Sequence, residues 1–161
     1  MAKPFEDGEI EGVVVKALEV RTDARGWLAE IFRSDDMSPD LIPAMAYVSV
    51  TRPGMGRGPH EHLLQTDVFC FLGRAAFEVR MWDNRPGSPT YRHHQSLVVA
   101  AGSLILVIIP PGVVHGYRNV GNVGGMMINL PNRLFRGRGR SEPVDEIRSE
   151  DDPGSPFKLE P

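Results

Sequence analysis

The stretch RGPHEHLLQTDVFCFLG, residues 57–73, places two histidines one residue apart just ahead of a run that is typical of a β-strand. In an extended chain alternate side chains face the same side, so His60 and His62 point together while Glu61 points away. Asp67 follows at the start of the apolar run. Two imidazoles and a carboxylate therefore gather in one place, where they can act either as metal ligands or as proton carriers.

Short apolar runs rich in valine and isoleucine recur along the chain between turns that contain glycine or proline. They cover residues 12–21, 27–34, 44–50, 67–73, 75–82, 95–101, 103–110 and 124–130. No segment shows a convincing helical period. Short strands at roughly even spacing predict an all-β fold, namely a sandwich, a barrel or a jelly roll.

The composition is that of one globular domain. The chain has 161 residues, of which 41% are hydrophobic and 24% charged, and its 17 glycines and 14 prolines favour many turns. We expect a single domain over residues 1–161, with a polar tail from about 133 to 161 in which arginines precede acidic residues. Such a tail is typically solvated and mobile, and the alternative is that it folds back over the mouth of the barrel.

Charge and apolar content limit the partners of the protein. The formal net charge of −3 gives no overall attraction to nucleic acid or to anionic lipid, and the arginines near residue 136 are not interleaved with aromatic residues. No run approaches the roughly 20 apolar residues of a membrane span, and no signal peptide is seen. We expect a cytoplasmic protein with neither a nucleic-acid nor a membrane partner. The single cysteine, Cys70, is expected to be a buried small hydrophobe.

A second histidine-bearing stretch, PPGVVHGYRN at residues 110–119, has the pattern P-x-G-x-x-H-x-x-x-N. With the earlier H-x-H and its following acid, it resembles the cupin superfamily, with Asp67 in place of the usual glutamate. The resemblance implies a double-stranded β-helix, or jelly roll. In metal-binding cupins the matching three histidines and one acid ligate a divalent ion, here through His60, His62, Asp67 and His115. Such ligands suit iron, manganese, zinc, nickel or copper.

Four further segments fall in order along residues 10 to 120. They have the forms D-x-R-G-(aromatic)-x-x-E at 23–30, R-G-x-H at 57–60, D-x-R-x-x-S-P-T at 83–90 and P-x-G-x-x-H-G-(aromatic) at 110–117. In these the chain resembles the nucleotide-sugar epimerases typified by dTDP-4-dehydrorhamnose 3,5-epimerase, a family of jelly-roll cupins that are usually dimeric. The S-P-T segment we expect to be a structural loop.

This resemblance implies a reaction on a dTDP-linked 4-keto-6-deoxy sugar, without a cofactor. A base removes a proton next to the C4 ketone, the enolate is stabilised, and an acid returns a proton to the opposite face. By the match His60 is the base, and Asp152 in EDDP is the carboxylate that orients it.

The same match assigns a set of substrate-binding residues. Arg25, Glu30 and Arg57 fall on positions that grip the nucleotide and its diphosphate, and His115 completes the set. A planar guanidinium suits phosphate because it can donate two parallel hydrogen bonds. The resemblance also implies a homodimer.

Two departures from the family bear on mechanism. Asp67 occupies the position of a lysine that stabilises the enolate, and a bare carboxylate there would oppose an enolate by on the order of several kcal/mol. The family's acidic tyrosine should fall within residues 126–137, which contain none. Tyr117 is our first candidate to replace it, with Tyr47 and Tyr91 as the others.

These departures keep other functions open. A divalent metal at the four cupin positions would supply the missing electrophile and would suit a dioxygenase, a lyase or an isomerase for another small substrate. The R-G-x-H-x-H pattern also resembles nucleotide-sugar 3,4-ketoisomerases, which are cupins in which both histidines are proposed to shuttle protons. A small-molecule binding protein without catalysis is the remaining alternative.

Overall fold

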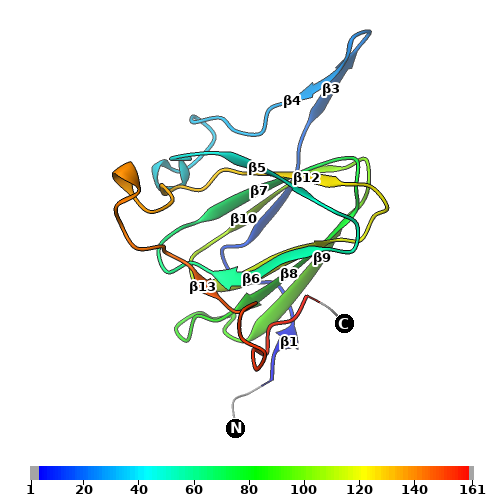
Figure 1. The fold of residues 1–161 in the computed structure, drawn as a ribbon. Helices are drawn as coiled ribbons and strands as arrows, with labels where there is room; N and C mark the ends of the chain where they lie inside the picture. Colours follow the sequence, from blue (N-terminus) through cyan, green and yellow to red (C-terminus); the bar gives the residue numbers. More distant parts are fainter. Residues whose placement is uncertain (1–3, 160–161) are drawn as a thin grey trace.

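The computed structural model describes residues 4–159, and almost all of its regular structure is β-strand (Figure 1). Six strands form one sheet in the order β1 (Glu6–Asp7), β9 (His93–Val99), β8 (Phe77–Asp83), β11 (Val113–Asn119), β6 (Gly56–Glu61) and β13 (Ile147–Arg148). Five strands form a second sheet in the order β2 (Val14–Ala17), β10 (Leu104–Ile109), β7 (Asp67–Leu72), β12 (Gly125–Asn129) and β5 (Tyr47–Thr51). The helical turns among the described residues are two short 3-10 segments, η1 (Pro39–Leu41) and η2 (Arg138–Arg140).

The two sheets lie face to face and enclose the core, so the predicted jelly roll is confirmed (Figure 1). Strand β8 shows how the pattern works, because its inward residues Phe77, Val79 and Met81 are all fully buried while Glu78 and Arg80 between them are not. Phe69 and Phe71 meet them from β7 in the opposite sheet. Fully burying a side chain of this size contributes about 1.5–3 kcal/mol.

Strand β7 is buried on both faces. Phe69 and Phe71 point into the space between the sheets, whereas Val68 packs outward against Leu106 and Leu130. Cys70 is completely buried within this strand, as expected, and burial raises the pKa of its thiol to about 11.

The segment after residue 133 is not the free tail that its composition suggested. Strand β13 pairs with β6, so residues 147 and 148 extend the six-stranded sheet. Phe157 and Leu159 are each only 9% exposed and pack with Trp82 and Val114 on the outer face of that sheet. The pairing of β13 with β6 and the burial of these two apolar side chains therefore outweigh the polar composition. The segment folds back along β6 and the outer face of its sheet, whereas the alternative had placed it over the mouth of the barrel.

Two strands leave the body of the molecule. Strands β3 (Val20–Asp23) and β4 (Gly26–Ala29) form a separate hairpin that projects away from both sheets (Figure 1). Trp27 and Leu28 on this hairpin are 59% and 56% exposed.

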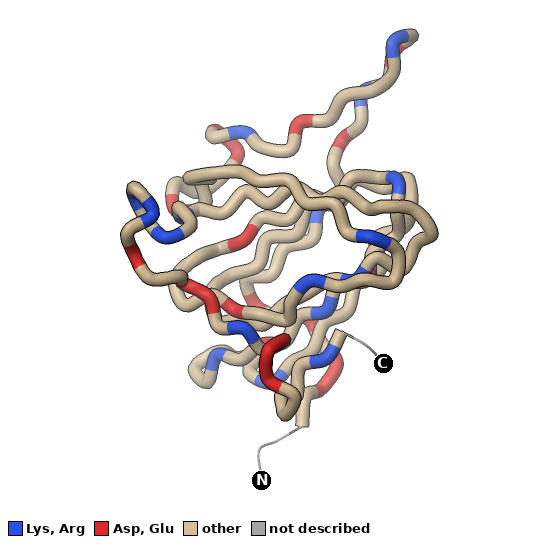
Figure 2. The backbone as a smooth tube through the Cα atoms, in the orientation of Figure 1, with Lys and Arg blue, Asp and Glu red and all other residues tan. Residues whose placement is uncertain are grey.

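Charged residues are spread over loops and strands, with basic and acidic positions interspersed along the chain (Figure 2). In residues 4–159 there is no helix long and apolar enough to cross a membrane.

Candidate active site

Neighbouring strands bring the predicted histidines and the aspartate together. His60 on β6 pairs with His115 on β11, His62 lies just beyond the end of β6, and Asp67 begins β7 in the opposite sheet. The ring of His60 lies 4.6 Å from that of His115 and 5.3 Å from that of His62, centroid to centroid. One nitrogen or oxygen of each of the four residues lies within 4.8 Å of the others.

A glycine permits the close approach of β6 and β11. Gly58 has a φ of +80°, and a Cβ atom there would lie 2.8 Å from the carbonyl oxygen of His115 and 3.0 Å from Nδ1 of His60. The strand pairing also shifts register between His115 and Tyr117. Only glycine adopts this conformation without strain and leaves room for both imidazoles.

Asp67 is the centre of the cluster. Its side chain is 1% exposed, and Oδ2 lies 3.1 Å from Nε2 of His115 and 3.3 Å from Nε2 of His62. Its Oδ1 accepts hydrogen bonds from Gln65 at 2.8 Å and from Asn129 at 2.9 Å. Burial alone would raise the pKa of Asp67, but the two histidines outweigh it and hold the pKa well below its usual range. The carboxylate is therefore stabilised in its ionised form.

Two of the three histidines are fixed at both ring nitrogens. Nδ1 of His115 lies 2.9 Å from the carbonyl oxygen of Val113, and Nδ1 of His62 is hydrogen-bonded to the carbonyl oxygen of Asp145. In each ring Nε2 then faces Asp67. Burial would lower the pKa of His62, but its hydrogen bond to Asp67 and the charge of that carboxylate raise it.

His60 differs from the other two. No hydrogen bond to its ring is made by residues 4–159, and the closest carboxylate oxygen, Oε1 of Glu146, lies 3.9 Å from its Nδ1. Its side chain is 18% exposed. Burial first, and then the neighbouring His115 and His62, lower the pKa of His60 to about 3. His60 is thus a neutral, partly accessible imidazole.

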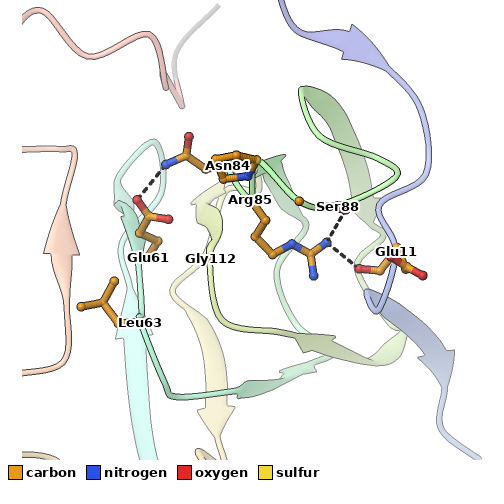
Figure 3. Close-up of a pocket in the computed structure, with 9 residues that line it drawn as sticks. Glu11, Glu61, Leu63, Asn84, Arg85, Ser88 and Gly112 are labelled. Atoms are coloured by element: carbon orange, nitrogen blue, oxygen red, sulfur yellow. Dashed lines mark hydrogen bonds between the residues drawn. The ribbon is translucent and has the colours of Figure 1, made fainter.

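Glu61 points away from the histidines, as strand alternation predicted. It lines a separate open cleft on the other face of β6, where Asn84 donates to it at 2.9 Å (Figure 3). The same cleft holds Arg85, which donates to the carbonyl oxygen of Glu11 at 2.8 Å. Burial raises the pKa of Glu61. This cleft is not part of the histidine cluster.

The S-P-T segment has the structural role expected of it. Asp83 is fully buried and accepts hydrogen bonds from Arg85, Ser88 and Thr90, the last two at 2.6 Å. These bonds tie the loop after β8 to the end of that strand.

The structure places the other predicted site residues in different regions. Arg57 lies on β6, and its guanidinium donates to Thr51 Oγ1 and to the carbonyl oxygen of Val50 on β5. Arg25 lies at the turn of the projecting hairpin, pairs with Asp23 and has an 88% exposed side chain. Glu30 follows that hairpin and lies 3.6 Å from Arg33.

The contacts of Asp152 and His115 in the structure differ from those that the family resemblance implied. The carboxylate of Asp152 accepts the amide N–H of Gly154 in an exposed turn, and no ion pair or hydrogen bond joins it to His60. His115 is 2% exposed, and its Nε2 lies 3.1 Å from Oδ2 of Asp67.

The tyrosines occupy three distinct environments. Tyr117 is 2% exposed, its ring packs against Phe69, Phe71 and Phe77, and its hydroxyl lies 2.9 Å from Ser49 Oγ. Tyr91 lies in the loop between β8 and β9 and is 40% exposed. Tyr47 begins β5, is 45% exposed, and accepts a hydrogen bond from Asn129 at 3.1 Å.

Sequence reasoning missed four residues that complete the cluster, namely Gln65, Asn129, Asp145 and Glu146. Alternation along β12 could have placed Asn129 next to Asp67, because the polar residue ends an apolar strand. The side chain of Asp145 accepts the amide N–H groups of residues 63, 64 and 65 and so fixes the turn after His62. Asp145 and Glu146 arrive through the pairing of β13 with β6, for which the sequence gives no local signal.

Comparison with known proteins identifies the family. The family model described as dTDP-4-dehydrorhamnose 3,5-epimerase matches residues 7–129, about three quarters of the chain. The protein belongs to this family. The predicted resemblance is therefore confirmed, and with it the assignment to a family of sugar-nucleotide epimerases.

Two curated relatives support the family assignment. The chain is 37% identical over 128 residues to a probable low-salt glycan biosynthesis epimerase, Agl13, of Haloferax volcanii, covering 78% of this chain and 81% of that protein. It is 34% identical over 115 residues to the spore coat polysaccharide biosynthesis protein SpsL of Bacillus subtilis, covering 70% and 73%.

Among solved structures, a dTDP sugar isomerase from Desulfovibrio desulfuricans G20 superposes with a TM-score of 0.76 at 23% identity, over 92% of this chain and 91% of that one. NovW, a 4-keto-6-deoxy sugar epimerase from Streptomyces spheroides, superposes with a TM-score of 0.72 at 23% identity, over 92% and 77%. These two likenesses establish the fold.

Proposed function

We propose that this protein epimerises or isomerises a dTDP-linked 4-keto-6-deoxy sugar through an enolate, with His60 as the base. The base takes the proton from the carbon next to the C4 ketone, and the electrons of that C–H bond move into the enolate. Family membership supports the substrate class, and the geometry of the cluster supports the assignment of the base.

The observation that carries this proposal is the difference among the three histidines. Both ring nitrogens of His62 and of His115 face hydrogen-bond partners, whereas no residue from 4 to 159 makes a hydrogen bond to the ring of His60. His60 is also partly exposed, so a substrate can reach it. A base needs a free lone pair within reach of the proton that it removes.

Asp67 does not oppose an enolate in the way that a bare carboxylate would. Its Oδ2 lies against His62 and His115 and its Oδ1 accepts hydrogen bonds from two amide N–H groups, so these contacts stabilise the charge in place. The site therefore replaces the family's lysine with an aspartate that holds two imidazoles in place. A bare carboxylate would oppose the enolate by on the order of several kcal/mol, and these contacts reduce that repulsion.

We assign the orientation of His60 to Glu146 rather than to Asp152. Oε1 of Glu146 lies 3.9 Å from Nδ1 of His60, and the Glu146 side chain is only 13% exposed. A carboxylate beside a histidine base fixes the ring and stabilises the imidazolium that forms. For Glu146→Gln we expect kcat to fall by about 10-fold or more with little change in KM, because only a transition-state interaction is lost. An unchanged kcat would contradict this positioning role.

The proposed reaction is tested by proton exchange at the sugar. Incubating the protein with dTDP-4-keto-6-deoxyglucose in D₂O should place deuterium at C3 or C5 and invert at least one of these centres, as followed by NMR and mass spectrometry. His60→Ala should abolish both exchange and inversion. His93→Ala is the matched control, because that histidine lies on β9 and bonds to the carbonyl oxygen of Glu9, away from the cluster. Exchange that persists in His60→Ala would overturn the assignment of the base.

We further propose that the protein is a homodimer in which the β3–β4 hairpin of one copy covers the other. The hairpin projects from its own body (Figure 1), Arg25 lies at its turn and Glu30 directly follows it, so we place both residues away from the cluster of their own chain. Trp27 and Leu28 present exposed apolar surface on the hairpin, and Val48 and Val50 do so on the outer face of edge strand β5. An edge strand with exposed valines is a natural site for association.

This arrangement predicts that Arg25 and Glu30 grip the nucleotide in the partner's site, while Arg57 acts in its own. Light scattering should give twice the mass of one chain, and Trp27→Glu combined with Leu28→Glu should give monomers that retain the melting temperature of the fold. A monomeric wild-type protein with full activity would contradict the dimer.

A second candidate function rests on the same four residues, as a metal-dependent cupin. In His62 and in His115 a carbonyl oxygen holds Nδ1, and in Asp67 two amides hold Oδ1. The remaining atoms, Nε2 of each histidine and Oδ2 of the aspartate, are directed at one another. Outer partners of this kind are typical of metal ligands. His60, His62, Asp67 and His115 therefore fit a divalent transition metal, which when bound would act as a Lewis acid on a substrate oxygen.

Elemental analysis of protein purified without an affinity tag or chelator tests the metal. About one equivalent of a transition metal, lost in His62→Ala, would favour the metal-dependent enzyme. Full exchange activity in protein with less than a tenth of an equivalent would contradict it.

We place the protein in the cytoplasm as part of this proposal. Its buried Cys70 is a free thiol, which suits a reducing compartment. Fractionation of the source cells with an antibody against the protein would test this location.

A further inference from the structure

An epimerase of this kind needs an acid on the face of the sugar opposite the base, and the position of the family's tyrosine holds none here. The chain offers three tyrosines for this task, and their surroundings separate them. Tyr117 is shut into the core by three phenylalanine rings, and its hydroxyl is already paired with Ser49. Tyr91 is 40% exposed and follows Thr90, whose hydroxyl is bonded to Asp83 in the loop between β8 and β9.

Tyr47 and His60 come from opposite sheets. Strand β5 is the edge of the five-stranded sheet, and β6 lies next to the edge of the six-stranded sheet. The two strands approach each other where Arg57 donates to Thr51 and to the carbonyl oxygen of Val50. Tyr47 lies four residues before Thr51 on β5, and His60 lies three residues after Arg57 on β6, so each residue is in its own sheet. Asn129, which bonds to the Tyr47 hydroxyl and to Asp67, joins Tyr47 to the histidine cluster from the side of the five-stranded sheet.

The hydrogen-bond network leaves the proton of Tyr47 available. The backbone N–H of Val68 donates to Oδ1 of Asn129 at 3.1 Å, which fixes the orientation of the amide. Nδ2 of Asn129 must then donate to the hydroxyl oxygen of Tyr47 at 3.1 Å and to Oδ1 of Asp67 at 2.9 Å. The Tyr47 oxygen is therefore an acceptor, and no acceptor for its own O–H is found in residues 4–159.

We propose that Tyr47 is the general acid that returns a proton to the enolate on the face opposite His60. This inference rests on the proposed function. In the step, the enolate carbon forms a C–H bond as the O–H bond of Tyr47 breaks, and the C4 carbonyl re-forms. The phenolate keeps the hydrogen bond from Asn129 and regains a proton from water, while His60 releases its proton to water.

The surroundings of Tyr47 suit an acid that is protonated before the reaction. Burial of the hydroxyl end raises the pKa of Tyr47, while the hydrogen bond from Asn129 works in the opposite direction and favours the phenolate. The same Asn129 side chain joins Tyr47 to Asp67, so the acid and the aspartate that anchors the histidines share one scaffold.

The test separates removal of the proton from inversion of the centre. Tyr47→Phe removes one hydroxyl and keeps the ring, so the fold should survive, which a melting curve checks. With dTDP-4-keto-6-deoxyglucose in D₂O, the variant should still exchange deuterium into C3 or C5 through His60, within about 5-fold of wild type. Net inversion should fall by at least about 100-fold, the usual contribution of a general acid. Deuterium should then appear in sugar of unchanged configuration.

Two matched variants complete the experiment. Tyr117→Phe removes the other inward hydroxyl, and Tyr91→Phe removes an exposed one, and both should invert the centre at rates within about 3-fold of wild type. Inversion at the wild-type rate in Tyr47→Phe, or its selective loss in Tyr117→Phe, would overturn the role of Tyr47 and leave the proposed function standing. Wild-type protein that neither exchanges nor inverts this substrate would overturn the proposed function itself.

Discussion

Two buried aspartates, Asp67 and Asp83, show how the same side chain serves a site and a scaffold in one molecule. Their exposed fractions are 1% and 0%, and both carboxylates are bonded at each oxygen. In both, hydrogen bonds outweigh burial and hold the pKa below its usual range. Their partners, however, belong to different chemical classes.

The hydrogen-bond donors to Asp83 are groups that do not change charge. Arg85 donates through its backbone N–H, Nε and an η nitrogen, and Ser88 and Thr90 add their hydroxyls. An arginine stays protonated in proteins, so this network is permanent. Asp67 is bonded instead by two imidazoles and two amides, and those imidazoles border the accessible ring of His60. A permanent network holds a loop, whereas a network of imidazoles places reactive side chains.

The sharpest test of this contrast is Asp67→Asn. An amide brings N–H groups toward His62 and His115 and removes the charge that both rings face, so both rings should turn. The ring of His60, which packs against them, should then lose its orientation. We expect turnover with dTDP-4-keto-6-deoxyglucose to fall by about 1,000-fold, equivalent to about 4 kcal/mol of activation free energy. The melting temperature should change by only a few degrees. Activity within 10-fold of wild type would show that the imidazoles do not depend on Asp67.

The reverse pattern is expected for Asp83→Asn. Removing one partner of a buried ion pair costs about 3–5 kcal/mol, and because Arg85 is 26% exposed we expect about 2–3 kcal/mol of unfolding free energy, measured in urea. The folded fraction should turn over substrate within about 2-fold of wild type. Loss of activity without loss of stability would mean that this loop contributes directly to the reaction.

The pH dependence of stability isolates the same carboxylate. The pKa of Asp83 is lower in the folded protein than the unfolded value of about 3.9, so its stabilisation is present above that pH. It is lost as the pH falls through the folded pKa. The difference in unfolding free energy between wild type and Asp83→Asn should therefore stay constant from about pH 8 to pH 5 and shrink below about pH 4. A difference that grows on acidification would have the wrong sign for this network.

The sequence was sufficient for the parts of the site that depend on local pattern. Alternation placed His60 and His62 on one side of β6 and Glu61 on the other, and the turn before β11 placed His115. The eight apolar runs predicted an all-β fold, and the resemblance to cupins narrowed it to a jelly roll. These features depend on the period of a strand and on turn residues, which a single sequence displays directly.

What escaped prediction depends on contacts between distant segments. Strand β13 is two residues long and lies in a polar stretch, so nothing local indicated that Glu146 would lie beside His60. The family match instead directed attention to Asp152, which lies a few residues further along in an exposed turn. The compensation of Asp67 likewise needs Asn129 from a strand 62 residues away. Such pairings are decided by tertiary packing rather than by composition.

The smallest expected effect, that of Gln65→Leu, measures how much redundancy the Asp67 network holds. Nε2 of Gln65 lies 2.8 Å from Oδ1 of Asp67 and 3.1 Å from Nε2 of His62, but Asn129 also donates to Oδ1. One of two donors is lost, at about 1 kcal/mol, so turnover should fall by only about 3- to 10-fold.

Asn84→Leu is the matched control for this change, because it removes an amide that serves Glu61 in the outer cleft and should leave turnover unchanged. A loss in Gln65→Leu as large as that in Asp67→Asn would show that Asn129 does not hold the carboxylate by itself. Equal rates in the Gln65 variant and its control would show that Asn129 is sufficient, and that the second donor serves only to position the turn between His62 and Asp67.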